Sequence, residues 1–176
     1  MRKVLYIFGQ LNDIDIEWLI QTGKRQELLK GTILIKEGQA SDYLYIVLEG
    51  SLAVSNRSLG QIASLGVGEM VGEMSFIDAS PPSATLQAVS NIVVFTLPRE
   101  AINQKIKNDT AFAARFYRAI AMFLSDRIRS LNTVQARDHD PYAESLENDE
   151  LDLNVLDNVY LAGQRFDRIL KRMLEK

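Results

Sequence analysis

Residues 31–55 read GTILIKEGQASDYLYIVLEGSLAVS, and this stretch decides the fold class. Short runs of β-branched and aromatic residues (GTILI, YLYIVLEG, SLAVS) alternate with turn-forming Gly, Ser and Asp. Similar runs, QIASLG and QAVSNIVVFTL, follow before Pro98. Many short strands at this spacing indicate a β-sandwich or barrel rather than a parallel sheet with crossover helices. We therefore predict a β-rich region from Gly31 to about Pro98.

Helical patterns flank this region on both sides. Residues 11–30 predict a short helix, because Asn12 is a capping residue type, Ile16 and Leu19 recur at helical spacing, and Gly23 follows. After Pro98 a longer helix is predicted, since large apolar side chains recur every three or four residues over about six turns. These side chains are Phe112, Phe116, Ile120, Phe123, Leu124, Ile128 and Leu131.

The long helix is apolar on a second side as well. Ala114, Tyr117, Ala119, Ala121 and Met122 lie there. A helix with more than one apolar stripe must bury more than one surface. We expect one side to pack on the β-region and the other on a second copy of the helix, which gives a homodimer through residues 112–131. A single broad core helix is the alternative.

The C-terminal part divides into two segments. Residues 135–150, QARDHDPYAESLENDE, are acidic and nearly free of large apolar side chains, which is typical of a linker. Residues 151–176 predict an amphipathic helix, with Lys171 and Arg172 near its C-terminus, where the helix dipole favours cations. The predicted organisation is a domain with its trailing helix over residues 1–131, an acidic linker over 132–150 and a final helix over 151–176.

The composition argues against catalysis and metal binding. The chain has 176 residues, no cysteine and one histidine, His139, which lies in the acidic segment. A disulfide, a thiolate metal site and a catalytic thiol are therefore excluded. His139 has no neighbouring cluster of metal ligands and no evident serine partner, and no GxxxxGK[ST] loop occurs. We predict a protein that is not an enzyme and holds no metal.

Membrane and DNA contacts are not expected either. The richest apolar run, AFAARFYRAIAMFL, is interrupted by Arg115 and Arg118, and the N-terminus lacks a small-residue cleavage site. The formal net charge is −3, and the roughly 45 residues after Leu131 open acidic, too few for a winged helix-turn-helix with its linker. We expect a cytoplasmic protein.

The β-rich region resembles the cyclic-nucleotide-binding domains of catabolite activators, cyclic-nucleotide-dependent kinases and gated channels. The resemblance rests on Gly31, the pair Glu37-Gly38, the run YIVLEG at residues 45–50, and LGVGEMVGEMSF at residues 65–76. It covers residues 11–131. It implies an α+β, mainly β fold, in which an eight-stranded jelly-roll sandwich (a double-stranded β-helix) has flanking helices and a long C-terminal helix that mediates dimerisation.

The resemblance also places a phosphate-binding cassette at residues 71–85, VGEMSFIDASPPSAT. In the family the residue at the position of Glu73 accepts a hydrogen bond from the ribose 2′-hydroxyl, and Gly72 allows close approach to the backbone. The ligand-binding residues implied are Gly72, Glu73, Met74, Ser75, Ser83, Ala84 and Thr85. The implied ligand is cAMP or cGMP, with no other cofactor. The alternative is that Glu73 only satisfies nearby backbone amides.

Pro82 departs from the family pattern, because members normally carry there an arginine that pairs with the cyclic phosphate. Such a pair contributes about 1.5–3 kcal/mol, and Pro81 and Pro82 also lack an N–H. A cation from Arg57, Arg99 or Arg115 is a possible substitute.

Two functions follow from this departure. One is a non-enzymatic regulatory sensor that binds a cyclic nucleotide or a related anion and signals through its C-terminal helices. The other is a degenerate domain without ligand, which acts as a dimerising scaffold for an unidentified protein partner.

Overall fold

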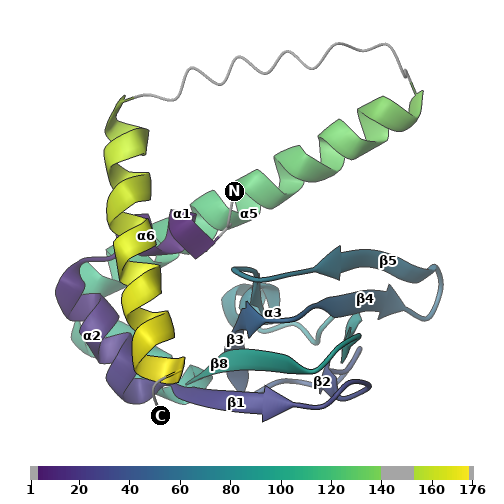
Figure 1. The fold of residues 1–176 in the computed structure, drawn as a ribbon, viewed down its shortest axis with the longest axis horizontal. Coiled ribbons are helices and arrows are strands. Elements are labelled where there is room, and N and C mark those ends of the chain that lie inside the picture. The colour runs from purple at the N-terminus through teal and green to yellow at the C-terminus, as the bar shows by residue number, and fades with distance from the viewer. Residues whose placement is uncertain (1–3, 140–152, 175–176) are drawn as a thin grey trace.

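The computed structural model describes residues 4–139 and 153–174, and its centre is a sandwich of two four-stranded antiparallel sheets (Figure 1). The strand order is β1-β8-β3-β6 in the first sheet and β2-β7-β4-β5 in the second. The strands are β1 Lys24–Leu28, β2 Ile33–Ile35, β3 Tyr43–Glu49, β4 Leu52–Asn56, β5 Gly60–Leu65, β6 Met70–Val71, β7 Thr85–Ala88 and β8 Ile92–Pro98. The predicted β-sandwich with flanking helices is confirmed.

Strand β3 contributes side chains to two hydrophobic cores, one on each face of the first sheet. Successive side chains of a strand point to opposite faces. Leu44 and Ile46 are buried against the helices, whereas Tyr45 and Val47 are buried between the two sheets. A strand covered on both faces reads as a continuous apolar run, which is why YLYIVLE lacks a polar alternation.

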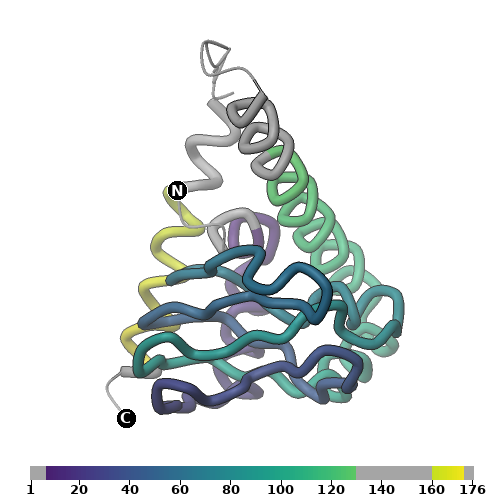
Figure 2. Tube along the Cα trace, turned by 90° about the vertical axis from the view of Figure 1, so that its right-hand side faces the viewer, coloured from purple at the N-terminus to yellow at the C-terminus, as the bar shows by residue number. Residues whose placement is uncertain are grey.

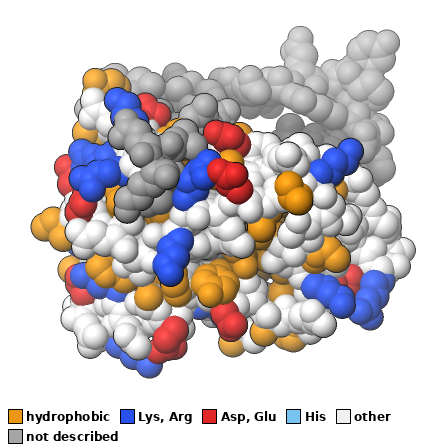
Figure 3. Space-filling model, turned by 60° about the horizontal axis from the view of Figure 1, so that its bottom comes forward, with side chains coloured by type: hydrophobic (Ala, Val, Ile, Leu, Met, Phe, Trp, Pro, Cys, Tyr) orange, Lys and Arg blue, Asp and Glu red, His pale blue; other side chains and the backbone are white. Residues whose placement is uncertain are grey.

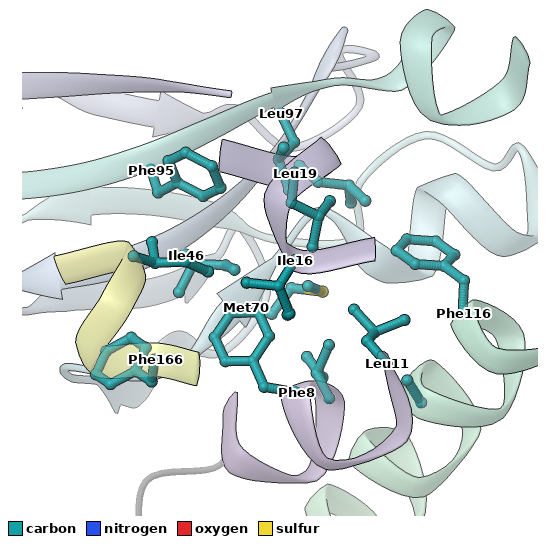
Figure 4. Packing of buried hydrophobic residues seen from close by; sticks show 14 of the residues in the cluster. Phe8, Leu11, Ile16, Leu19, Ile46, Met70, Phe95, Leu97, Phe116 and Phe166 are labelled. Carbon is teal, nitrogen blue, oxygen red and sulfur yellow. The ribbon is translucent and has the colours of Figure 1, made fainter. Parts of the chain in front are cut away.

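The helices cover the outer face of the first sheet. They are α1 Val4–Gln10, α2 Asp13–Thr22, α3 Glu73–Asp78, α4 Arg99–Asn108, α5 Thr110–His139 and α6 Leu153–Leu174. Helix α1 contacts both α5 and α6 and lies between them (Figure 2). Figure 4 shows Phe8 of α1, Ile16 of α2, Ile46 of β3 and Phe166 of α6 within the same core.

The N-terminal region differs from the prediction of one short helix over residues 11–30. Helix α2 ends at Thr22, and residues 24–28 form β1, the edge strand that pairs with β8. Its sequence, KRQEL, has no apolar alternation, so pattern alone did not reveal it. Gly23 joins the two elements, and a Cβ there would lie 2.1 Å from the Phe95 ring. Helix α1 was also not predicted.

The helical region after Pro98 is two helices rather than one. Helix α4 ends at Asn108, and the Asp109 carboxylate accepts a hydrogen bond from the Phe112 N–H (2.8 Å) at the start of α5. Helix α5 continues to His139, so the first part of the predicted linker 132–150 is helical. Residues 140–152 lie outside the described residues, and the division into domain, linker and final helix stays a prediction.

One side of α5 packs on the β-sandwich side of the molecule, as predicted. Phe112, Phe116 and Phe123 are fully buried there. A bidentate ion pair adds to this packing, since the Arg115 Nε and Nη2 atoms lie 2.7 and 2.9 Å from the carboxylate oxygens of the buried Asp15 on α2. Helix α5 is therefore fixed to α2 by charge as well as by apolar contact.

Helix α6 packs on its own chain. The Phe166 ring lies 6.0 Å from the Phe8 ring, and Arg165 donates hydrogen bonds to the Asp13 carboxylate and the Phe8 carbonyl oxygen (both 2.9 Å). The last helix thus completes the core around α1 and α2. No helix within residues 4–139 and 153–174 is long and apolar enough to cross a membrane.

Candidate functional site

The segment from β6 into α3 forms the wall of a cavity. Gly72 joins the two elements with φ 90°, and a Cβ there would lie only 3.0 Å from the Tyr43 carbonyl oxygen. Only glycine adopts this left-handed conformation without cost. The glycine lets Val71 end β6 and Glu73 begin α3 immediately after it.

The cavity has a volume of about 540 Å³, which is within the range of small-molecule sites. Six of the seven residues predicted to bind ligand line it: Gly72, Glu73, Met74, Ser75, Ser83 and Ala84. Thr85 does not line it. Its hydroxyl oxygen instead accepts a hydrogen bond from the Glu37 N–H (3.1 Å), which ties the cassette end to the loop after β2. That these residues bind a ligand stays a prediction.

Glu73 is buried and is held by a residue from the trailing helix. Its side chain is 2% exposed, and Arg127 Nη1 donates a hydrogen bond to Glu73 Oε1. Arg127 Nη2 also donates to the Met70 carbonyl oxygen (3.1 Å) and lies 3.4 Å from Glu69 Oε2. The Arg127 guanidinium stacks 4.8 Å above the Phe123 ring. The pair connects the cavity wall to α5.

The Glu73 carboxyl has a pKa that is raised by burial, although the charge of Arg127 acts in the opposite direction. The desolvation of a carboxylate disfavours its charged form. Glu73 therefore takes up a proton more readily than an exposed glutamate does.

Arg127 was not among the residues predicted from the sequence. The signal was present, because Arg127 follows Phe123 by four residues and so shares its side of the helix. Only the fold shows that Arg127 belongs to the cassette, because it brings residue 127 next to residues 69–73. A cation 54 positions away from Glu73 cannot be assigned to the cassette from spacing.

The three proposed substitute cations do not reach the cavity, and this expectation is wrong. Arg99 donates to the carbonyl oxygens of Ser41 (3.0 Å) and Ser75 (2.6 Å) and is held behind α3. Arg115 is paired with Asp15. Neither they nor Arg57 line the cavity.

The cassette end around Pro82 is apolar and anchored. The Pro82 carbonyl oxygen accepts a hydrogen bond from the Gly38 N–H (2.8 Å), and Pro81 and Pro82 both line the cavity. Neither proline offers an N–H. No group of three or more His, Cys, Asp or Glu side chains suited to a metal occurs in the described part of the chain.

Strands and α3 thus enclose a cavity of small-molecule size, with the Gly72-Glu73 pair in its wall. Comparison with known protein families shows which class of domain has this arrangement. Residues 25–109 match the family model of the cyclic nucleotide-binding domain. Residues 25–109 thus form a domain of the cyclic nucleotide-binding type.

Individual relatives support this assignment. The cAMP-dependent protein kinase regulatory subunit of Candida albicans is 32% identical over 75 residues, which are 43% of this chain and 16% of that protein. The corresponding subunit of Mucor circinelloides is 23% identical over 145 residues, 81% of this chain and 32% of that protein. Lysophospholipase nte1 of Emericella nidulans is 26% identical over 127 residues, 70% of this chain and 8% of that protein. The chain thus spans a third or less of each relative.

Solved structures show the same fold. The N-terminal domain of a transcriptional regulator from Streptomyces coelicolor has a TM-score of 0.59 and 27% identity, covering 75% of this chain and 94% of that one. The regulatory domain of Toxoplasma gondii PKA, solved with cAMP, has a TM-score of 0.54 and 28% identity, covering 58% and 42%. A cyclic nucleotide-binding domain from Methylobacillus flagellatus has a TM-score of 0.65 and 24% identity, covering 78% and 80%.

Proposed function

We propose that this chain is a non-enzymatic regulatory domain that binds a small molecule in the cassette cavity and passes the binding state to α5. The observation that carries the proposal is the hydrogen bond between Arg127 and Glu73. Glu73 lines the cavity, and Arg127 belongs to the helix that leads away from it. A ligand that hydrogen-bonds to Glu73 would compete with Arg127 for the same carboxylate.

Competition for Glu73 would alter the position of α5. A ligand shifts a conformational equilibrium only by its differential affinity for the two states. Binding that weakens the Arg127 contact favours the state in which this part of α5 is released. A second contact supports the coupling, since Phe76 of α3 lies edge-on to Phe116 of α5 with ring centroids 5.8 Å apart. Movement of α3 would reach α5 at two points.

The relatives indicate which ligands and partners to test first. Because several are cAMP-dependent protein kinase regulatory subunits, cAMP and cGMP are the first ligands, and a protein kinase is the first class of protein partner. A cytoplasmic location is part of the same proposal. Figure 3 shows Lys, Arg, Asp and Glu interspersed on one face, with no field of one sign there to favour DNA.

A homodimer through α5 is also proposed. Tyr117, Ala121 and Ile128 follow one another at intervals of four and seven residues, which fits a coiled-coil seam. Of the other residues predicted on the apolar sides of this helix, Ala119 is buried and Leu124 packs against the core of its own chain. Tyr117 is 44% exposed and Ile128 59% exposed. Because successive residues of a helix are about 100° apart around its axis, this stripe lies on the side of α5 opposite to the buried Phe112 and Phe116. A second copy of the helix would cover it.

The ligand-free scaffold is the second candidate. The observation in its favour is that Glu73 already has a charged partner and that Pro82 replaces the expected arginine. In this case the Glu73–Arg127 pair is a permanent structural link, and α5 or α6 recruits the partner.

Hydrogen exchange combined with ligand titration separates the two candidates. The sensor predicts a ligand that raises the melting temperature and changes amide exchange in α5 around Arg127. The exchange response should be lost in Arg127→Met, although binding persists. If neither cyclic nucleotides nor nucleosides at millimolar concentration shift the melting temperature, the scaffold is the correct reading.

A further inference from the structure

Resting on the proposed function, we infer that the cassette cavity takes an uncharged ligand of the nucleoside type, with a flat apolar ring and sugar hydroxyls, and rejects its phosphorylated form. The inference concerns the charge of the ligand, which neither the family nor the relatives fix for this chain. It comes from the charged groups around the cavity, from the chemistry of the cassette end, and from the apolar character of the remaining walls.

The charges around the cavity disfavour an anion. Among the described residues that line it, Glu69, Glu73 and Asp78 carry carboxylates, and Arg127 carries the one basic side chain. These carboxylates would repel a phosphate monoanion in a partly buried site, where charges are weakly screened. Arg127 is the one described lining residue that could offset this repulsion.

Arg127 does not offset this repulsion without a further cost. Its guanidinium is held at the start of the cassette by Glu73, Glu69 and the Met70 carbonyl oxygen. A phosphate that captured Arg127 would leave the 2%-exposed Glu73 carboxylate without its cation. Removing one partner of a buried ion pair is strongly unfavourable. A phosphate that takes Arg127 therefore meets this cost, whereas a neutral hydroxyl can donate to Glu73 and weaken the Arg127 contact without removing the cation.

The cassette end offers neutral donors only. Pro81 and Pro82 have no N–H, and the Pro82 carbonyl oxygen is already bonded to Gly38. The Ser80 N–H already donates to the Asp78 carboxylate (2.9 Å). The remaining polar groups are the hydroxyls of Ser80 and Ser83 and the backbone amides of Ser83 and Ala84. Such groups match the hydroxyls of a neutral molecule, and they bind anions weakly without a cation.

The rest of the cavity wall is apolar and suits a flat ring. The side chains that form it share aliphatic character and come from both sheets and from α3. They are Ile35, Val54, Ile62, Leu65, Val71, Met74 and Leu86. Glu73 provides one strong acceptor at the cavity wall, so a ligand hydroxyl would donate to it. An apolar body with hydroxyl donors and no phosphate satisfies all of these surfaces.

Calorimetric titration of the full chain with matched pairs tests the inference. The pairs are adenosine against cAMP and guanosine against cGMP. We expect at least one nucleoside to bind about tenfold or more tightly than its cyclic monophosphate, the difference that about 1.4 kcal/mol produces. A cyclic nucleotide that binds as tightly as its nucleoside or more tightly overturns the inference and leaves the proposed sensor standing. If none of the four compounds binds, both fail.

Two variants at residue 82 identify the cause of the preference. Pro82→Arg adds the guanidinium, whereas Pro82→Ala restores only the backbone N–H. We expect Pro82→Arg to strengthen cAMP binding about tenfold or more, with adenosine affinity nearly unchanged. Pro82→Ala should keep the wild-type preference. If Pro82→Ala strengthens cAMP binding as much as Pro82→Arg does, the missing charge is not the cause and the charge argument fails.

Discussion

Arg127 and Glu73 are 54 positions apart in the chain, yet one hydrogen bond joins the trailing helix to the first residue of the cassette helix. The Glu73 side chain is almost fully buried, whereas the Arg127 side chain is 21% exposed. The carboxylate therefore depends on the guanidinium more than the reverse.

Replacement of Arg127 by Met should destabilise the fold, because it leaves Glu73 buried without a cation. We expect the free energy of unfolding to fall by about 3 kcal/mol. The double variant Arg127→Met/Glu73→Gln should recover much of the loss, since the amide carries no charge. Urea denaturation of all four proteins measures the coupling. Strictly additive changes would show that the two side chains do not interact.

The raised pKa of Glu73 predicts a pH dependence of stability. Because burial raises the pKa in the folded state, the folded protein takes up this proton at a higher pH than the unfolded chain does. The stabilisation is fully present below the unfolded pKa and is lost as pH rises through the folded pKa. The unfolding free energy of the wild type minus that of Glu73→Gln should therefore decrease as the pH rises above about 4, the ordinary pKa of a glutamate. A difference that grows with pH would mean that the attraction of Arg127 exceeds the effect of burial.

The Asp15–Arg115 pair gives a second test of buried charge. Arg115→Met should lower the free energy of unfolding by about 3 kcal/mol, because the Asp15 side chain is 2% exposed and loses a bidentate partner. Arg118→Met is the matched control, since Arg118 is exposed on the same helix, and it should change stability by less than about 0.5 kcal/mol. Equal effects of the two substitutions would contradict the structural role of the pair.

Truncation of Phe166 tests whether α6 belongs to the core. Phe166 is 1% exposed and stacks on Phe8, so Phe166→Ala should cost about 3–5 kcal/mol. Tyr160→Ala, on the same helix at 68% exposure, should have little effect. Thermal and urea unfolding give the comparison. A Phe166→Ala protein as stable as the Tyr160→Ala protein would mean that α6 does not complete the core.

Charge placed on the exposed stripe of α5 tests the homodimer. We expect Ile128→Lys to shift the chain from dimer to monomer in sedimentation velocity, because a lysine in a helix seam opposes association. Tyr160→Lys is the control at an exposed apolar residue outside the stripe. A wild-type chain that sediments as a monomer at high concentration removes the proposed dimer.

The sandwich and the cassette were predictable because their signals are local. The apolar run of β3 and the Gly72-Glu73 pair are contiguous in sequence, and a left-handed Gly72 is required where the chain passes Tyr43. Strand β1 was missed because an edge strand with one partner needs no apolar alternation. Its five residues are specified by pairing with β8.

The charge partners were not predictable, since they depend on tertiary contacts. Arg99 and Arg115 were candidates for the substitute cation, but in the fold Arg99 donates to the Ser75 carbonyl oxygen and Arg115 pairs with Asp15. Arg127, which reaches the cavity, follows an apolar helix pattern in which charged residues are usually solvent-facing. Sequence therefore located the cavity and its unusual residue, Pro82, but did not reveal which cation lies beside it.

The position of α1 between α5 and α6 has a consequence for how the chain is made. Helix α1 packs on α5 and α6, which are both synthesised after it, and the Phe8 ring stacks on the Phe166 ring. The sandwich has all its strands by Pro98, well before Phe166. During translation the side of α1 that faces α6 thus stays uncovered until Arg165, 157 residues after Phe8, has been made. Exposed apolar surface of this kind is what chaperones bind, so a nascent chain stalled before α6 should be a better chaperone substrate than the finished one.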